Sequence, residues 1–346
     1  MSSMAEVFGG IDTHKDTVHV AAVDPLGRHL TDAEFSTDRA GYAAALAWLS
    51  RHGVLGRVGI EGTGSYGAGI AAAFTAAGVD VVEVNRPDRA TRRRLGKSDP
   101  IDAYAAAQAV VSGRATAVPK DHTTVVEAIR VIHGVRATAV KARTAALLEL
   151  DAFVVTAPAP LREALTGLAG ARRVTICASW RPGTDRADPT TATKTALRRL
   201  ARRIQALTVE ITDADHDLDS LTRAAAPQLR AILGVGPETA ATVLIAAGAN
   251  TDRISSEAAL AMLFGVAPIP ASSGRTHRHR LNRGGHRQAN RALHMIALTR
   301  LRRDPRTRAY RDRRTAEGHT KKEIIRCLKR YIARELYPVL TAALTT

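Results

Sequence analysis

The first 111 residues alternate apolar runs, turn signals and small-residue helical segments in an order that few folds accommodate. Apolar alternation predicts strands, Pro25-Leu26-Gly27 marks a turn, and Asp38 is placed to cap a helix. The expected order is β-β-β-α-β-α-β-α, over residues 6–11, 17–24, 28–36, 39–51, 57–61, 62–77, 79–84 and from 99 onward. Three meander strands followed by alternating helices and strands predict an α/β domain with a mixed sheet.

Four acidic residues fall at the ends of these predicted elements. Asp12 follows the first strand, Glu61 ends the fourth, and Asp99 and Asp102 lie one turn apart where the last helix starts. A single Asp after a strand is usually structural, but four acids in these positions match a ribonuclease-H-like arrangement, in which carboxylates meet at one edge of the sheet. Converging carboxylates suit a hard cation that holds phosphate oxygens, so we expect Mg²⁺, with Mn²⁺ as an alternative.

The charge of the chain is unevenly distributed. The formal net charge is +17, yet residues 1–102 hold 11 Lys/Arg and 13 Asp/Glu, which gives −2. Residues 275–314 hold 14 Arg against two Asp, which gives +12. A basic face is often only a solvated surface, but this density favours a region that binds nucleic acid, next to an acidic catalytic domain.

A serine pair lies inside that basic region. Ser272 and Ser273 precede Gly274, and a loop Ser-Ser-Gly by itself means little. Nearby arginines could stabilise a pentacoordinate phosphate and its leaving oxygen, and this raises the case for a nucleophile. The candidate nucleic-acid contacts in this part of the chain are Arg275, Arg278, Arg280, Arg283, Arg287 and Arg291. A serine hydroxyl needs an activating base or metal, and the sequence leaves open whether Mg²⁺ or a loop histidine serves.

Several histidines allow more than one interpretation. His14 and Lys15, next to Asp12, read equally well as surface residues or as substrate contacts. His277, His279 and His286 resemble a metal cluster only superficially, and we interpret them as solvated or phosphate-contacting residues.

The middle of the chain predicts long helices. Residues 123–150 are expected to be helical, and residues 155–190 read as a connector broken by prolines. A heptad seam follows, formed by Leu197, Leu200, Ile204, Leu207, Ile211, Ala214, Leu218 and Leu221. The seam favours a two-helix coiled coil, within or between subunits, over a long helix packed inside its own subunit.

The C-terminal third is predicted to be mainly helical, with helices at 256–263, 287–302 and 320–340 around a loop at 266–286. Two helical segments flank Gly234-Val235-Gly236, which resembles a helix-hairpin-helix whose backbone N–H groups contact a phosphate. The alternative is an ordinary helical turn. The expected domains are therefore a catalytic domain at 1–150, a connector with a coiled coil at 151–226 and a helical domain at 227–346.

Two classes of protein are disfavoured. Cys177 and Cys327 are isolated, which argues against a disulfide scaffold or a structural zinc site. The N-terminus lacks a secretory pattern, and no apolar run approaches the ~20 residues of a membrane span. We therefore expect a cytoplasmic protein that has no membrane partner.

Taken together, the motifs carry a family resemblance over nearly the whole chain. The N-terminal pieces are Gly-Ile-Asp-Thr-His-Lys at 10–15, Ile-Glu-Gly-Thr-Gly-Ser-Tyr at 60–66 and Lys-Ser-Asp-Pro-Ile-Asp-Ala at 97–103. The C-terminal pieces are Ile-Leu-Gly-Val-Gly-Pro-Glu-Thr-Ala at 232–240, Phe-Gly-Val-Ala-Pro at 264–268, Ser-Ser-Gly at 272–274 and Arg-Gly-Gly-His-Arg-Gln-Ala-Asn-Arg-Ala-Leu at 283–293. In this order they resemble the DEDD transposases of bacterial insertion sequences, insertion sequence family one-hundred-ten.

The resemblance implies a RuvC-like domain whose Asp12, Glu61, Asp99 and Asp102 bind Mg²⁺, a coiled coil, and a transposase domain whose catalytic serine matches Ser273. It implies covalent attack of that serine on a DNA phosphodiester, which gives a 5′-phosphoserine and frees a 3′-hydroxyl before strand exchange. It also implies guidance by a structured non-coding bridge RNA, and assembly into dimers or tetramers with a site shared between subunits. The family's spacing before Ser-Gly is slightly longer, which keeps Ser272 as an alternative.

Two other functions compete with the recombinase. A RuvC-like nuclease would cut DNA junctions with metal-activated water and would tolerate loss of Ser273. A non-catalytic nucleic-acid-binding protein would tolerate loss of Asp12, although the intact set of four acids argues against such decay.

Overall fold

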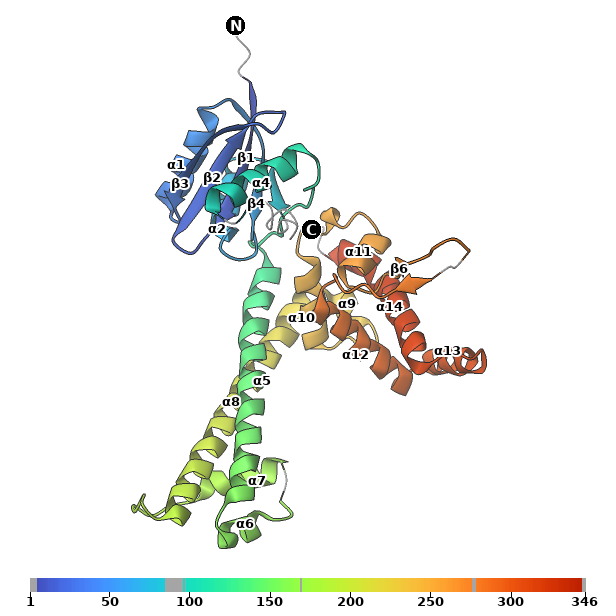
Figure 1. Ribbon diagram of the computed structural model, residues 1–346. Coiled ribbons are helices and arrows are strands. Elements are labelled where there is room, and N and C mark those ends of the chain that lie inside the picture. The colour runs from blue at the N-terminus through green and yellow to red at the C-terminus, as the bar shows by residue number, and fades with distance from the viewer. Residues whose placement is uncertain (1–4, 85–95, 97, 169, 276–277, 344–346) are drawn as a thin grey trace. The chain divides into compact units, whose positions relative to one another are not determined.

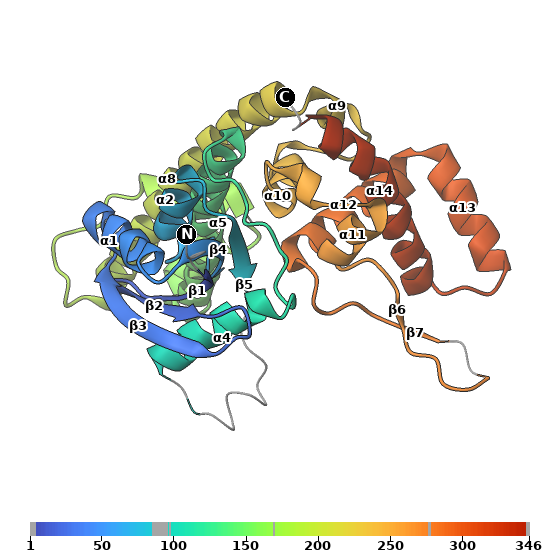
Figure 2. The same cartoon turned by 90° about the horizontal axis from the view of Figure 1, so that it is seen from above.

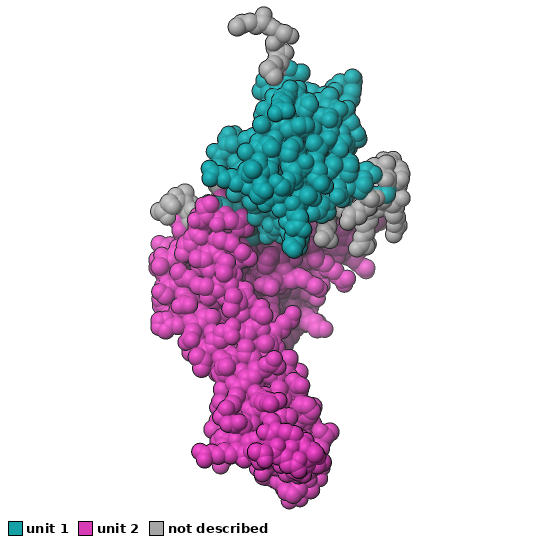
Figure 3. Space-filling model, turned by 90° about the vertical axis from the view of Figure 1, so that its left-hand side faces the viewer, with its two compact units in different colours: residues 1–121 teal, residues 122–346 magenta. Residues whose placement is uncertain are grey.

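The computed structural model describes residues 5–84, 96, 98–168, 170–275 and 278–343, so His277 lies outside the described residues. The chain forms two compact units, residues 1–121 (unit 1) and 122–346 (unit 2) (Figure 3). Residue 150, where the first domain was expected to end, lies inside a long helix of unit 2. Among the described residues, no helix is both long and apolar enough to cross a bilayer.

Unit 1 is built on a five-stranded mixed sheet with the strand order β3-β2-β1-β4-β5. Its strands are β1 (Glu6–Thr13), β2 (Thr17–Val23), β3 (His29–Ser36), β4 (Val54–Glu61) and β5 (Val81–Val84). Its helices are α1 (Arg39–Ser50), α2 (Ala68–Ala76) and α4 (Asp99–Val111). The first three strands pair antiparallel, and β1, β4 and β5 pair in parallel. The predicted order of elements is confirmed for the described residues, and it is consistent with a ribonuclease-H-like domain.

Helices cover both faces of this sheet (Figure 2). Helices α1 and α2 close one face over a core that includes Ile11, Ile60 and Phe74, and Asp38 caps α1 by accepting a hydrogen bond from the Gly41 N–H. Helix α4 lies on the opposite face. A Cβ atom on Gly10 would stand 2.1 Å from the carbonyl oxygen of Ala103, so α4 rests directly on the backbone of β1.

Unit 2 begins with an antiparallel pair of long helices, α5 (Val125–Thr156) and α8 (Pro189–Ala225) (Figure 1). Arg136 of α5 pairs with Asp215 of α8 at one end, and Leu150 packs with Leu197 near the other. Six of the eight predicted seam residues of α8 are buried, namely Leu197, Leu200, Ile204, Ile211, Ala214 and Leu218. The seam therefore packs within the chain, and a coiled coil between subunits stays a prediction.

The connector expected at 155–190 is wrong in part, because it contains α6 (Ala159–Leu165) and α7 (Gly170–Ser179). Pro160 stands in the first turn of α6, where its missing N–H leaves no hydrogen bond unmade, so it starts a helix instead of breaking one. Helix α7 buries Val174 and Cys177 against α5 and α8, which stabilises this end of the helix pair.

The rest of unit 2 is a helical body with a small hairpin. Its helices are α9 (Pro227–Ala231), α10 (Pro237–Ala247), the 3₁₀ turn η1 (Thr251–Arg253), α11 (Glu257–Leu263), α12 (Arg287–Arg303), α13 (Pro305–Ala316) and α14 (Lys321–Ala343). The hairpin is β6 (Ile269–Pro270) with β7 (His279–Arg280) and projects from the helices (Figure 2). The core of this body includes Leu244, Phe264, Leu293 and Leu336.

Helix α13 was not predicted. Its N-cap Asp304 accepts hydrogen bonds from the N–H groups of Arg306 and Thr307, and Pro305 occupies the first turn. Among its residues only Thr307 is buried, so the helix has almost no apolar stripe for a sequence pattern to detect.

Candidate functional site

The strand register brings Asp12 and Glu61 to the same edge of the sheet. In the parallel pair β1–β4, Gly10 lies opposite Gly59 and Ile11 opposite Ile60, so one further step sets Asp12 beside Glu61. The Thr13 hydroxyl also donates to the Glu61 carbonyl oxygen at 3.0 Å, which ties the two strand ends together. Gly10 and Gly59 both face α4, and strand alternation therefore turns Asp12 and Glu61 toward that helix.

Helix α4 supplies the other two acids in its first turn, where the helix dipole favours carboxylates. Asp102 is buried at 2% exposure, whereas Asp99 is partly exposed. Burial raises the pKa of the Asp12 carboxyl, the neighbouring His14 opposes that rise, and the nearby Asp102 and Asp99 add to it. Like charges gathered in a partly dry site are unfavourable without a cation, and this is the electrostatic setting of a metal centre.

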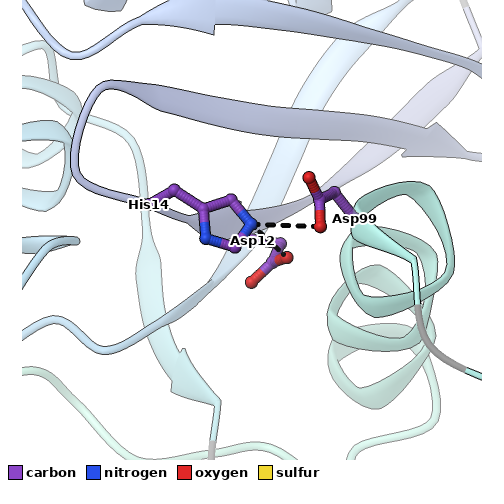
Figure 4. Close-up of side chains that lie close together, drawn as sticks. All are labelled: Asp12, His14 and Asp99. Atoms are coloured by element: carbon purple, nitrogen blue, oxygen red, sulfur yellow. Dashed lines mark ion pairs between the residues drawn. The ribbon is translucent and has the colours of Figure 1, made fainter.

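His14 joins this cluster, which the sequence interpretation left undecided. Its Nε2 lies 3.2 Å from Asp12 Oδ2 and 3.1 Å from Asp99 Oδ1 (Figure 4). One ligand atom from each of the three residues lies within 4.8 Å of the other two. Asp12 Oδ2 and His14 Nε2 are buried atoms that, in the described part of the chain, make no hydrogen bond. Two carboxylates and an imidazole fit a divalent cation: the carboxylates suit Mg²⁺ and Mn²⁺, and the imidazole nitrogen favours Mn²⁺ over Mg²⁺.

The signal for His14 was present in the sequence. Asp12 and His14 are two residues apart at the end of a strand, so alternation places both side chains on one face. The distance from that face to Asp99 could not be predicted from the sequence, because it depends on how closely α4 approaches the strands.

The two candidate serines differ in their contacts within unit 2. Ser272 Oγ accepts a hydrogen bond from the Arg278 N–H at 3.2 Å and lies 3.4 Å from its carbonyl oxygen, so this hydroxyl holds the hairpin together. Ser273 is exposed, and among the described residues its hydroxyl makes no hydrogen bond. Both serines are exposed, and which of them serves as the nucleophile stays a prediction.

The basic residues predicted to contact nucleic acid all belong to unit 2. Arg275, Arg278 and Arg280 are exposed on the hairpin, and Arg283 follows it. Arg287 and Arg291 lie one turn apart at the start of α12. No described acid forms an ion pair with any of the six.

The two glycines of the predicted helix-hairpin-helix, Gly234 and Gly236, differ in how closely other residues pack around them. Gly234 has a φ of 93°, and a Cβ there would meet Ile296 of α12 at 3.2 Å. Gly236 precedes α10, and no described atom lies within 4 Å of where its Cβ would be. Glu238, in the first turn of α10, lies 3.7 Å from His133, and this imidazole is the main cause that lowers the pKa of Glu238. A contact of Gly234 and Gly236 with a phosphate stays a prediction.

Two family models match the chain. Residues 9–157 match a model of the DEDD domain of IS110 elements, described as Transposase. Residues 226–312 match a model described as Transposase IS116/IS110/IS902 family. The matches cover 149 and 87 of the 346 residues, in the order that the motifs predicted.

Two curated relatives are similar over shorter segments. The insertion element IS110 uncharacterized 43.6 kDa protein of Streptomyces coelicolor is 36% identical over 115 residues, which are 33% of this chain and 28% of the relative. The insertion element IS900 uncharacterized 42 kDa protein of Mycobacterium paratuberculosis is 32% identical over 149 residues, which are 42% of this chain and 37% of the relative. The chain therefore spans well under two thirds of the length of either protein.

Proposed function

Because the chain belongs to the IS110 family of insertion-sequence transposases, we propose that it cuts and rejoins DNA strands to move such an element. The observation that carries the proposal is the convergence of Asp12, His14 and Asp99 at the sheet edge that also receives Glu61. A cluster of acids in which the buried Asp12 Oδ2 accepts no hydrogen bond from any described residue is suited to binding a metal together with the phosphate oxygens of a nucleic acid.

In this proposal Asp12, Glu61, Asp99 and Asp102 hold Mg²⁺, and His14 adds a nitrogen ligand to the same centre. When bound, the ion supplies Lewis-acid stabilisation of the charge that develops on a phosphate. The residues of the chain provide the rest. The four acids would hold the ion at this edge of the sheet, and the packing of α4 on Gly10 sets the separation between the two carboxylates of the strands and the two of the helix.

Ser273 is the proposed nucleophile. Its Oγ forms a bond to the phosphorus of a DNA phosphodiester while the bond to the 3′-oxygen breaks, which leaves a 5′-phosphoserine and a free 3′-hydroxyl. The proton of the serine passes to a neighbouring base, and the departing 3′-oxygen takes up a proton. Arg275 and Arg278 are exposed and follow the serine in the same hairpin, and they would stabilise the negative charge of the pentacoordinate phosphate. The free hydroxyl of Ser273, compared with the engaged one of Ser272, supports this choice.

The DNA partner is the end of the element and its target, and we also propose a structured guide RNA. The +12 charge of residues 275–314 supports a polyanion partner of this kind, because counterion release favours binding to phosphate backbones. Because acids and serine belong to different units of the chain, the proposal includes a dimer or tetramer in which subunits share active sites.

A second candidate is a structure-specific DNA nuclease that uses metal-activated water. It is favoured by one observation, namely that the predicted acids all lie in unit 1, without any contribution from the serine loop. It differs from the first candidate in needing no covalent intermediate.

The test is excision of the intact element with its native flanks in bacterial cells, read by PCR across the circle junction. We expect junctions from the wild type and from Ser272→Ala, and none from Asp12→Ala or Ser273→Ala. Junctions that survive Ser273→Ala would contradict the proposed nucleophile. They would indicate Ser272 if its variant is inactive, and the metal-and-water nuclease if neither serine matters.

A further inference from the structure

A second candidate site lies in unit 2, in a cavity whose lining does not include Ser272 or Ser273. A cavity of about 970 Å³ opens between α14, the start of α12 and the strand end of the hairpin. Its lining includes several Arg and Lys side chains and one tyrosine. The polar and aromatic residues of this lining include Arg280, Arg283, Arg326, Lys329, Tyr331 and Asn290.

Four of the cationic side chains that line this cavity have no acidic partner among the described residues. Arg330 and Arg334 also line it, but both pair with Glu257. Among the described residues, no acid pairs with Arg280, Arg283, Arg326 or Lys329. Positive groups that face a common concave space without acidic partners attract an anion, and low-dielectric walls strengthen that attraction.

Lys329 is held at the inner wall by a defined network. Its Nζ donates to Asn290 Oδ1 at 2.8 Å, and Asn290 Nδ2 donates to the carbonyl oxygens of Gly265 at 2.8 Å and Phe264 at 3.1 Å. The ammonium group is half-buried, and burial lowers its pKa, with the nearby Arg326 as a smaller cause. Since one hydrogen bond to Asn290 uses only one of its three N–H donors, the group can also donate to a phosphate oxygen.

Tyr331 gives the cavity an aromatic surface. Its side chain is 51% exposed, and the ring of Tyr310 meets it edge-on with centroids 5.7 Å apart. The ring is thus braced by a neighbour and still has area free for stacking. Aromatic side chains beside a basic groove are how proteins hold the unstacked bases of single strands, whereas the bases of a duplex are covered by their neighbours.

We propose that this cavity binds a single-stranded segment of nucleic acid, with Lys329, Arg326, Arg280 and Arg283 around its phosphates and Tyr331 stacked on a base. The inference rests on the proposed function only in taking a nucleic acid as the ligand. DNA and RNA share the phosphates and bases on which it depends, so the experiment separates them.

The experiment measures binding of the full-length protein to labelled oligonucleotides of about ten nucleotides by fluorescence anisotropy, over a series of salt concentrations. The probes are a DNA strand, an RNA strand of the same sequence, and the corresponding duplexes. We expect single strands to bind more tightly than duplexes, and the tighter of the two strands identifies the source. Tighter binding of duplexes would overturn the proposal, and so would equal competition by polyglutamate.

The variants separate phosphate contact from stacking. Arg326→Met should reduce the slope of log affinity against log salt by about 0.7, because one phosphate contact to a single strand is lost. Tyr331→Ala should weaken binding at least about fivefold with an unchanged slope, and Tyr331→Phe should bind as the wild type does. Arg326 and Tyr331 are exposed, so neither change should unfold the protein, and thermal denaturation checks this.

The matched control is Arg308→Met on α13, which removes the same charge from unit 2 outside the cavity. Equal slope changes for Arg308→Met and Arg326→Met, together with no effect of Tyr331→Ala, would overturn the proposal in favour of a general basic surface. If binding follows these expectations while the excision experiment fails, the proposed function is wrong and the cavity assignment stands.

Discussion

At the scale of single residues, substitution of His14 tests most directly which side chains bind the metal. Its Nε2 stands between Asp12 and Asp99, so His14→Ala removes one ligand and leaves the carboxylates in place. We expect Mn²⁺ affinity, measured by calorimetry, to fall about tenfold or more, with a smaller loss for Mg²⁺, which prefers oxygen ligands. The control is Asp16→Asn, which changes an exposed acid nearby. Unchanged affinity in His14→Ala would mean that the histidine only orients the acids.

In the metal-free protein, the charged carboxylate of Asp12 should lower the stability of the fold. Its folded-state pKa is raised above 3.8, mainly by burial, so the folded state holds the proton more strongly than the unfolded state does. The charged carboxylate therefore destabilises the fold above the folded pKa, and this penalty disappears as the pH falls below about 3.8. With chelator present at neutral pH, Asp12→Asn should raise the free energy of unfolding by on the order of 1 kcal/mol. Denaturant titrations at neutral and acid pH check this, and a loss of stability at neutral pH would contradict it.

At the scale of elements, the contact between α4 and β1 determines whether the acids meet. A Cβ on Gly10 would stand 2.1 Å from Ala103 O and 2.2 Å from Ala107 N, both backbone atoms of the helix. Gly10→Ala should therefore push α4 off the sheet, at a cost of about 3 kcal/mol, and weaken metal binding together with stability. Gly64→Ala is the control, because no described atom lies within 4 Å of that position. Metal titration and thermal denaturation of both variants test whether metal binding depends on the contact between α4 and β1. Normal metal affinity in Gly10→Ala would contradict this dependence.

The start of α5 depends on a second ionised group. Glu127 accepts from Arg130 Nε at 2.8 Å and lies 2.9 Å from His122 Nδ1, and these contacts, the one to Arg130 first, lower its pKa to about 2. Because the folded pKa is lowered, the stabilisation is present above about pH 4.5 and is lost as the pH falls toward 2. Glu127→Gln should cost about 0.5–1 kcal/mol at neutral pH, since the pair is partly solvated.

Denaturant midpoints measured from neutral pH downward would test the role of Glu127, with Glu149→Gln on the same helix as the control. The difference between Glu127→Gln and the wild type should shrink over the acid range. A difference that stays constant with pH would assign the effect to lost packing instead of charge.

At the scale of the whole molecule, the sequence predicted most where periodicity and position were sufficient. Strand alternation and Asp38 located the described strands and helices of unit 1, and with them the positions of Asp12, Glu61 and Asp99. Prediction from the sequence failed where a feature leaves no periodic pattern of apolar residues. Helix α13 has almost no apolar face, the prolines near α6 begin a helix instead of preventing one, and the role of His14 depends on a distance across two elements.

The separation of acids and serine into two units leads to a test of the assembled molecule. If active sites are shared between subunits, Asp12→Ala and Ser273→Ala should each be inactive alone and should restore one another when expressed together. With equal, random mixing, roughly a quarter of the sites would combine an intact acid cluster with an intact serine, because each half is intact in half of the subunits. Circle-junction PCR should then recover junctions at a reduced level. A co-expressed pair that yields none, while both proteins accumulate normally, would place the acids and the serine of each site in one subunit.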